Sequence, residues 1–282
     1  MTKNILITGS SGYIGSHIVN KSKKLFNFNK FSLQTHTLQT INFNNIDTVL
    51  HCAAIVHKKN KLNFAKYYKI NTKYPVELAK RAKQNGVNHF VFLSTIAIYD
   101  DSLEMIVEKS KINPTTFYGK SKLEAERQLL ELCDNNFLIS IIRIPMVYGK
   151  GAPGNITTLI QMVKYLPIIP LGNIKNKRSF IYIENLSNLV NKIIINKTKG
   201  IFLGCDDKAI STSQFVELIA RCLNKFCIVF KIPLLEPVLK TILPSFHRKL
   251  FMSLVIDNQK TKLKLSLTNP YSVEDGIKEM MS

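Results

Sequence analysis

The feature that most constrains this chain lies at its N-terminus, where an apolar stretch (residues 4–8) leads directly into Gly9, Gly12 and Gly15. Glycine permits a tight turn and lets a pyrophosphate approach the backbone N–H groups. Residues 13–26 then carry apolar side chains near helical spacing. The N-terminus of such a helix presents the positive end of its dipole. We therefore predict a strand–turn–helix unit that binds a nucleotide, and not merely a structural turn.

Beyond this turn, apolar stretches rich in Val, Ile and Phe alternate with helical patterns. This alternation is typical of a parallel sheet covered by helices on both faces. We predict an α/β fold, a Rossmann-like doubly wound parallel sheet. The expected strands are residues 47–54, 89–95 and 137–144, and the expected helices are residues 70–84 and about 116–133.

The pattern loosens after residue 150. A capping box begins a helix at Ser211, with Gln214 as its partner, and a similar pair, Ser272 and Asp275, opens a last short helix. No low-complexity linker separates the two halves. We expect a dinucleotide-binding domain in residues 1–150 and a smaller substrate lobe in residues 151–282, interleaved with the first. Further expected elements are helices at 155–166 and 184–196 and a strand at 200–205.

The chain carries 39 basic and 19 acidic residues, a net charge of +20. Such a charge fits either an anionic partner or lysines spread over solvated faces. The lysines are scattered and no nucleic-acid motif is present, so we expect no nucleic-acid partner. The five cysteines form no C-x-x-C and the six histidines show no ligand spacing, so no metal site is expected. With no signal peptide and no long apolar run, the prediction is a cytoplasmic protein without a transmembrane segment.

Residues 226–252 alternate apolar clusters with basic residues and prolines. A peripheral contact with a membrane surface is one interpretation. The favoured one is a helix–loop cap over a substrate cleft, because the prolines prevent a single long amphipathic helix.

Tyr118 and Lys122 lie on one face of the helix that follows Pro114. An ammonium near a phenol favours the phenolate, so we expect Lys122 to lower the pKa of Tyr118 toward working pH. The pair could then exchange a proton with a substrate hydroxyl or carbonyl. Thr95 ends the preceding strand, where its hydroxyl could steady the same oxygen.

These residues occur within a series of longer matches. Several stretches of the sequence, in the same order along the chain, resemble those of the extended short-chain dehydrogenases. This family includes nucleotide-sugar epimerases, dehydratases and reductases. The matching stretches are ITGSSGYIGSHIV, DTVLHCAA, KINTKYPVELAKRA, FVFLSTIAIY, NPTTFYGKSKLEAE and IIRIPMVYGKG. In the C-terminal half, KNKRSFIYIENL, GKGAPGN and the last stretch from Leu250 resemble the branch of UDP-N-acetylhexosamine 4-epimerases and 4-keto-6-deoxy-sugar reductases of surface-polysaccharide synthesis.

The resemblance implies roles. Tyr118 would be the acid/base, Lys122 its activator and Thr95 the supporting hydroxyl, with Ser94 the less favoured neighbour. A nucleotide-diphosphate sugar would contact Thr95, Asn155 and Arg178, whose guanidinium suits bidentate phosphate binding. A homodimer through the Tyr118 helix is also implied, with Leu123, Leu129 and Leu130 in the contact or in the chain's own core. The implied NAD or NADP contacts are Gly9, Gly12, Tyr13, Ile14, Gly15, Ala53, Ala54, Asn71, Tyr118, Lys122 and Pro145.

The sequence departs from the family pattern in two places. An acidic residue ordinarily grips the NAD ribose about 20 positions beyond the glycines, but the first acidic residue here is Asp47. This slightly favours NADP, although the stretch from Gly15 to Asp47 is too short for a complete strand–helix–strand unit. The 4,6-dehydratases carry an acidic pair after the catalytic Thr, where this chain has Ile96 and Ala97, so dehydration is disfavoured.

We therefore expect an NAD(P)-dependent oxidoreductase acting at C4 of a nucleotide sugar. A 4-epimerase and a 4-reductase remain equal alternatives. A non-catalytic, dinucleotide-sensing protein on the same fold is a third, since a fold alone does not give a function.

Overall fold

The computed structural model describes residues 2–32, 36–56, 62–225, 228–230, 232 and 235–282. A six-stranded parallel sheet forms its centre, with strand order β10-β6-β4-β3-β1-β2. Four of the strands were predicted within the N-terminal half and one in the C-terminal half. The strands are β1 (Lys3–Thr8), β2 (Phe26–Phe31), β3 (Thr48–His51), β4 (His89–Thr95), β6 (Leu138–Ile144) and β10 (Gly200–Leu203).

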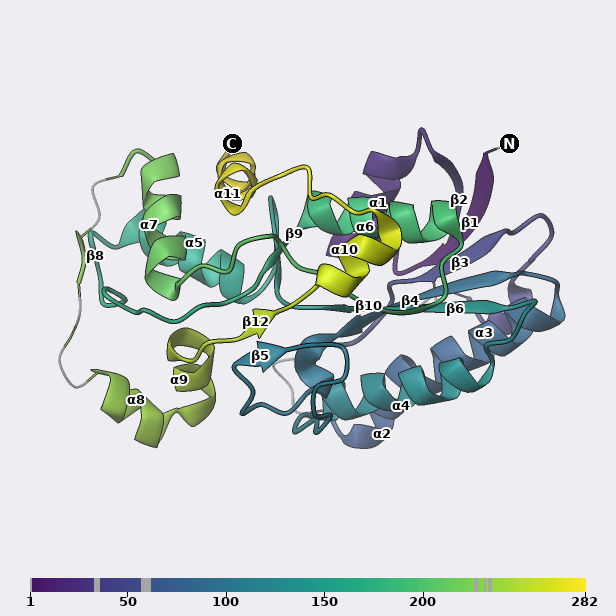
Figure 1. The fold of residues 1–282 in the computed structure, drawn as a ribbon, viewed down its shortest axis with the longest axis horizontal. Helices are drawn as coiled ribbons and strands as arrows, with labels where there is room; N and C mark the ends of the chain where they lie inside the picture. Colours follow the sequence, from purple (N-terminus) through teal and green to yellow (C-terminus); the bar gives the residue numbers. More distant parts are fainter. Residues whose placement is uncertain (1, 33–35, 57–61, 226–227, 231, 233–234) are drawn as a thin grey trace.

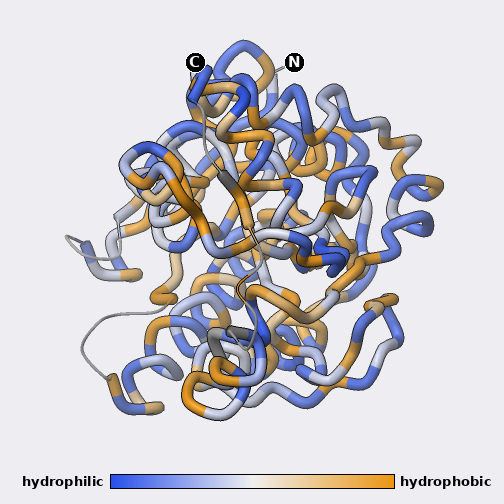
Figure 2. Tube along the Cα trace, turned by 90° about the vertical axis from the view of Figure 1, so that its left-hand side faces the viewer, coloured by the Kyte–Doolittle hydropathy of each residue, from blue (hydrophilic) through white to orange (hydrophobic). Residues whose placement is uncertain are grey.

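Helices cover both faces of this sheet, which confirms the predicted doubly wound α/β architecture (Figure 1). On one face lie α1 (Tyr13–Ser22) and α6 (Ile183–Asn196); on the other lie α3 (Tyr74–Gln84) and α4 (Phe117–Glu131). Each layer has its own buried apolar cluster. In Figure 2, hydrophobic and hydrophilic stretches alternate along the trace of the chain.

The N-terminal helix is shorter than the sequence pattern suggested. It ends at Ser22, and the chain forms β2 from Phe26 onward, where residues 13–26 had been taken as one helix. Leu25, which lies within the range predicted as helical, is 48% exposed in the turn between them. Phe26 and Phe31 are buried instead, which anchors this stretch as an edge strand.

The connection from β2 to β3 contains a single 3-10 turn, η1 (Leu38–Thr40), among its described residues. Apolar side chains of this connection, Leu38, Ile41 and Phe43, pack into the cluster beneath α3. As the short spacing before Asp47 predicted, the described part of this connection contains no complete helix between the two strands. We call it the compact crossing; its residues 33–35 lie outside the described part.

The C-terminal part adds β10 and α6 to the central layers and builds a smaller set of helices beside them (Figure 1). Capping boxes begin α7 at Ser211 and α11 at Ser272, as predicted. The remaining helical elements are α2 (Phe64–Tyr68), η2 (Lys69–Lys73), η3 (Ile96–Ile98), α5 (Asn155–Tyr165), α7 (Thr212–Cys222), α8 (Leu235–Ile242), α9 (Pro244–Phe251), α10 (Gln259–Leu265) and α11 (Val273–Met281). The short pairs are β5 (Met105–Ile106) with β12 (Val255–Ile256), β7 (Val147–Tyr148) with β9 (Ile181–Tyr182), and β8 (Ile168–Ile169) with β11 (Ile228–Val229).

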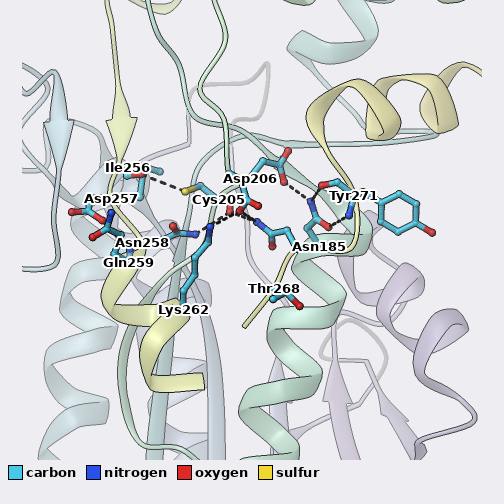
Figure 3. Close-up of polar contacts among 12 residues, drawn as sticks. Asn185, Cys205, Asp206, Ile256, Asp257, Asn258, Gln259, Lys262, Thr268 and Tyr271 are labelled. Carbon is cyan, nitrogen blue, oxygen red and sulfur yellow. Dashed lines mark hydrogen bonds and ion pairs between the residues drawn. The ribbon is translucent and has the colours of Figure 1, made fainter. Parts of the chain in front are cut away.

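A polar junction fastens the closing segment of the chain to the end of β10 (Figure 3). The buried carboxylate of Asp206 accepts hydrogen bonds from Asn185 (2.8 Å) and from the hydroxyl of Tyr148 (2.7 Å). Asn185 also donates to the carbonyl of Tyr271 (2.9 Å), and Asn258 donates to that of Cys205 (3.0 Å). These bonds fix α10 and α11 against the sheet layer.

The described part of 226–252 forms two helices, α8 and α9, which are separated at Leu243, and Pro244 is the first residue of α9. This break agrees with the expectation that prolines prevent one long helix; residues 226–227, 231 and 233–234 lie outside the described part. On α8, Val238 is 48% and Ile242 is 70% exposed, so a membrane contact stays a prediction. No helix in the described part of the chain has both the length and the apolar character needed to cross a bilayer.

Candidate active site

The glycine turn between β1 and α1 is packed backbone to backbone. Gly9 has φ +75°, and a Cβ on it would lie 2.6 Å from the nitrogen of Ala53. A Cβ on Gly15 would lie 2.2 Å from the carbonyl oxygen of Gly9. Gly12 caps α1 without a side-chain hydrogen bond, and the first turn holds no acidic residue. The helix N-terminus is therefore open to an anion, and the turn fits the pyrophosphate of a dinucleotide.

The parallel sheet gathers the other predicted residues at the same edge. Ala53 follows β3, Thr95 ends β4 and Pro145 follows β6, all at the carboxyl ends of their strands. Thr8 is in register with His51, and Thr95 with Ile144. In doubly wound sheets, ligands bind at this carboxyl edge. The sheet thus brings the glycine turn, the alanines and Thr95 to one edge.

Thr95 and Tyr118 are joined directly. Tyr118 is half-buried in the first turn of α4, which begins where the Thr116 hydroxyl accepts a hydrogen bond from the N–H of Gly119 (3.0 Å). Gly119 allows this turn to approach η3, since a Cβ there would lie 2.2 Å from the carbonyl oxygen of Ala97. The Tyr118 side chain is consequently hydrogen-bonded to that of Thr95.

The electrostatics of the pair differ from the expectation. Burial raises the pKa of Tyr118 to about 12, and the hydrogen bond with Thr95 offsets part of that rise. Burial also lowers the pKa of Lys122 to about 7, although the nearby carboxylate of Glu126 raises it. The expected lowering of the Tyr118 pKa by Lys122 is therefore wrong in this structure, because burial favours the neutral form of each group.

Lys122 is fully buried, with its ammonium 3.6 Å from the centre of the Phe92 ring. Contact with an aromatic face stabilises a cation. The lysine thus lies beneath the carboxyl edge of the sheet, where a few neighbouring groups, and not solvent, determine its protonation state.

Asn71 links the loop that follows β3 to α4. Its amide accepts from the N–H of Ile55 (2.9 Å) and donates to the carbonyl of Ile55 (3.0 Å) and the hydroxyl of Ser121 (3.1 Å). It lies in η2, a short π-helical segment, a feature that is frequent at functional sites. The loop after β3 and the helix of Tyr118 are therefore held by one side chain.

The structure adds residues that the sequence interpretation missed. Glu126, one turn beyond Lys122 on α4, forms a buried ion pair with Arg143 of β6 (2.6 Å). Ser94, weighed only as a substitute for Thr95, donates instead to Glu126. Two features of the sequence could have indicated this ion pair: Glu126 shares a helix face with Lys122, and Arg143 lies within an otherwise apolar strand.

The two predicted substrate contacts lie in the C-terminal part. Arg178 donates from its guanidinium to the carbonyls of Met252 (2.9 Å) and Arg248 (3.3 Å), at the end of α9. Asn155 is the exposed first residue of α5. Their contact with a nucleotide stays a prediction.

The three leucines offered for a dimer contact separate into two groups. Leu123 and Leu129 are buried in apolar clusters of the same chain, whereas Leu130 is 38% exposed. The alternative of an intramolecular role is therefore confirmed for two of them, and the homodimer rests on the resemblance alone.

Comparison with known proteins adds to this geometry. The family model for the NAD dependent epimerase/dehydratase family matches residues 5–202. A UDP-glucose 4-epimerase of Vibrio cholerae is 31% identical, over 99% of this chain and 94% of that protein. Solved structures that share the fold include the following two. A UDP-glucuronic acid 4-epimerase from Bacillus cereus in complex with NAD has a TM-score of 0.78 at 20% identity, covering 99% of this chain and 97% of that one. A dTDP-4-dehydrorhamnose reductase from Bacillus anthracis in complex with NADP has a TM-score of 0.77 at 19% identity, covering 99% of each chain.

Proposed function

The chain belongs to the NAD dependent epimerase/dehydratase family, and from this premise we propose that it oxidises or reduces C4 of a nucleotide-diphosphate sugar. The observation that carries the proposal is the hydrogen-bonded Thr95–Tyr118 pair at the same sheet edge as the glycine turn. A bound nicotinamide dinucleotide would supply or accept the hydride there.

Each residue has a distinct part in this proposal. Tyr118 exchanges a proton with the oxygen on sugar C4, and Thr95 orients that oxygen. Lys122, once charged, stabilises the phenolate that forms when Tyr118 gives up its proton. The positive charge on an oxidised nicotinamide would act in the same direction, opposing the effect of burial on the Tyr118 pKa.

Two reactions fit these residues equally well. In a 4-epimerase, the hydride leaves C4 and returns to the opposite face; in a 4-reductase, a 4-keto sugar is reduced once. Ile96 and Ala97, the first two residues of η3, carry no acid or base for eliminating water. We propose a UDP-N-acetylhexosamine or its 4-keto-6-deoxy derivative as substrate, with a role in surface-polysaccharide synthesis.

The C-terminal part supplies the proposed contacts to the rest of the substrate. A guanidinium has five N–H donors, so Arg178 can bind a diphosphate while retaining a bond to the end of α9. Asn155 would contact the sugar or nucleotide. Such contacts agree with a division into a dinucleotide domain and a substrate lobe.

The choice between NAD and NADP depends on the end of β2. The described residues there include the exposed Lys30 and His36, and no acidic side chain precedes Asp47 to repel a 2′-phosphate. This supports a slight preference for NADP.

A single experiment tests the reaction. Purified protein is incubated with UDP-N-acetylglucosamine and with its 4-keto-6-deoxy derivative, each with and without NAD(P)H. An epimerase forms the C4 epimer without net consumption of the dinucleotide, and a reductase consumes NAD(P)H with the keto sugar only. Absence of both products, together with unchanged cellular behaviour of a Tyr118→Phe strain, would favour the non-catalytic dinucleotide sensor.

A further inference from the structure

A buried carboxylate links α4 and β4, which carry the catalytic residues, to the neighbouring strand β6. Glu126 of α4 accepts a hydrogen bond from Ser94, the neighbour of Thr95 on β4, and pairs with Arg143 of β6 through N–O distances of 2.6 and 3.1 Å. Arg143 is in register with Ser94 and lies two residues before Pro145. The side chains of Ser94, Glu126 and Arg143 are all buried.

Arg143 is itself fixed from a second side. Its guanidinium donates to the hydroxyl of Tyr99 (2.7 Å) and to the carbonyl of Glu108 (3.4 Å), and it lies over the Tyr99 ring at 5.1 Å. Arg143 is thus held by contacts on both sides, and it presents its guanidinium to the Glu126 carboxylate.

Stability alone is a weak reason for this arrangement. Removing two charges from water is expensive, and replacing a buried ion pair by apolar side chains is often neutral or stabilising. The neighbourhood already offers apolar packing, since Phe92, Ala125 and Ile141 around it are fully buried. A charged pair at this position therefore calls for a role in the chemistry next to it.

That role follows from the groups that face Lys122. On its own helix, Glu126 lies one turn ahead and Tyr118 one turn behind. From the end of β3 come His51, whose pKa burial lowers to about 3, and Cys52, whose pKa burial raises to about 12, so both are neutral near pH 7. From β4, Phe92 offers its ring. Among these described neighbours, Glu126 alone carries a negative charge.

We propose that Glu126 is a positioning residue that keeps the Lys122 ammonium charged behind Tyr118, and that Arg143 limits this effect by sharing the carboxylate. The carboxylate also fixes β4 and β6 against α4 through Ser94 and Arg143. The same group therefore influences both the charge of Lys122 and the position of α4 on the sheet. This inference rests on the proposed function, in which a charged Lys122 assists Tyr118. Removing the charge of Glu126 should therefore lower the pH at which Lys122 titrates, and removing that of Arg143 should raise it.

The direct test measures Lys122 without any substrate. The pH titration of the lysine side chains is followed by NMR in protein labelled with ¹³C at lysine Cε, and the Lys122 signal is assigned by its loss in Lys122→Met. We expect Glu126→Gln to shift the titration midpoint downward by about one pH unit or more, and Arg143→Gln to shift it upward. Glu124→Gln removes a partly exposed carboxylate from the same helix and should leave the midpoint unchanged.

Conservative variants guard against simple unfolding, which thermal melting detects. Arg143→Lys keeps the positive charge, and Glu126→Asp keeps the negative one, so both should restore most of the wild-type midpoint. Midpoints that stay in place in Glu126→Gln and Arg143→Gln, or that move in the same direction, would overturn the inference. If Arg143→Gln does not fold, equal midpoints in Glu126→Gln and Glu126→Asp overturn it instead.

Kinetics separate this inference from the proposed reaction. The alkaline limb of the kcat/KM profile should move to lower pH in Glu126→Gln and to higher pH in Arg143→Gln, whereas purely structural damage lowers the rate without moving the limb. If the two variants shift the Lys122 midpoint in opposite directions but the wild-type protein turns over no nucleotide sugar, the charge coupling is supported and the proposed function is contradicted. Turnover with no NMR shift would do the reverse.

Discussion

Replacing Gly15 by alanine tests the assignment of the glycine turn as the dinucleotide site. The new Cβ would lie 2.2 Å from the carbonyl oxygen of Gly9 and 2.9 Å from its carbonyl carbon. Both are backbone atoms, so α1 must move away from the turn by about 1 Å to restore ordinary contact distances near 3.5 Å. Overpacking of this kind costs about 1–3 kcal/mol of stability. A displacement of about 1 Å in a binding element can reduce its function about 100-fold.

The assay compares this variant with one that is destabilised elsewhere. Gly86 has φ +79° and open space around a Cβ, so Gly86→Ala strains the backbone after α3 without a collision. We expect both variants to lose free energy of unfolding in urea, and Gly15→Ala alone to lose at least about tenfold in affinity for NAD(H) or NADP(H), measured by calorimetry. Unchanged dinucleotide affinity in a folded Gly15→Ala protein would refute the assignment.

Three further outcomes follow from the described contacts. Tyr118→Phe removes the proton donor but keeps the ring, so turnover should fall about 100-fold or more while dinucleotide affinity is retained; a fully active variant would contradict the acid/base role. Burial lowers the pKa of Lys122 from 10.5 to about 7, so the folded protein releases this proton at lower pH than the unfolded chain does. Its contribution to the free energy of unfolding should therefore rise from about pH 7 toward pH 10.5, and Lys122→Met should remove that rise in urea titrations. Leu129→Ala opens a cavity beneath α4 and should destabilise the protein by about 2–5 kcal/mol, whereas the exposed Leu130→Ala should change stability little; equal losses would argue against the burial of Leu129.

The sequence predicted the central layers well because their signals are local. A fully buried parallel strand such as β4 is a continuous apolar run, and its bounds at His89 and Thr95 were read directly from the residues. The capping box at Ser211 likewise acts within one helical turn. Edge strand β2 was missed because its alternation of Phe and polar residues is short and follows a helix after only three residues.

The electrostatics of the site were harder to read, because they depend on what surrounds each group in space. Spacing placed Lys122 on the same helix face as Tyr118, but it could not show how far each side chain is buried, and burial is the largest cause of both pKa shifts. The partner of Glu126 is Arg143, seventeen positions along the chain and on another element. Only the fold brings that pair together.

The compact crossing between β2 and β3 bears on the choice between an epimerase and a reductase. An epimerase keeps its dinucleotide through many turnovers, whereas a reductase must exchange it each time. In this chain the glycine turn is intact, but the adenine side lacks an early acidic residue and is built by the single turn η1 in the described part. We infer that such a side would make fewer contacts with a bound dinucleotide, which would weaken its retention and favour exchange. Protein purified without added cofactor should accordingly carry little bound dinucleotide by absorbance and mass spectrometry, and a stoichiometric complement of NAD would instead favour the epimerase.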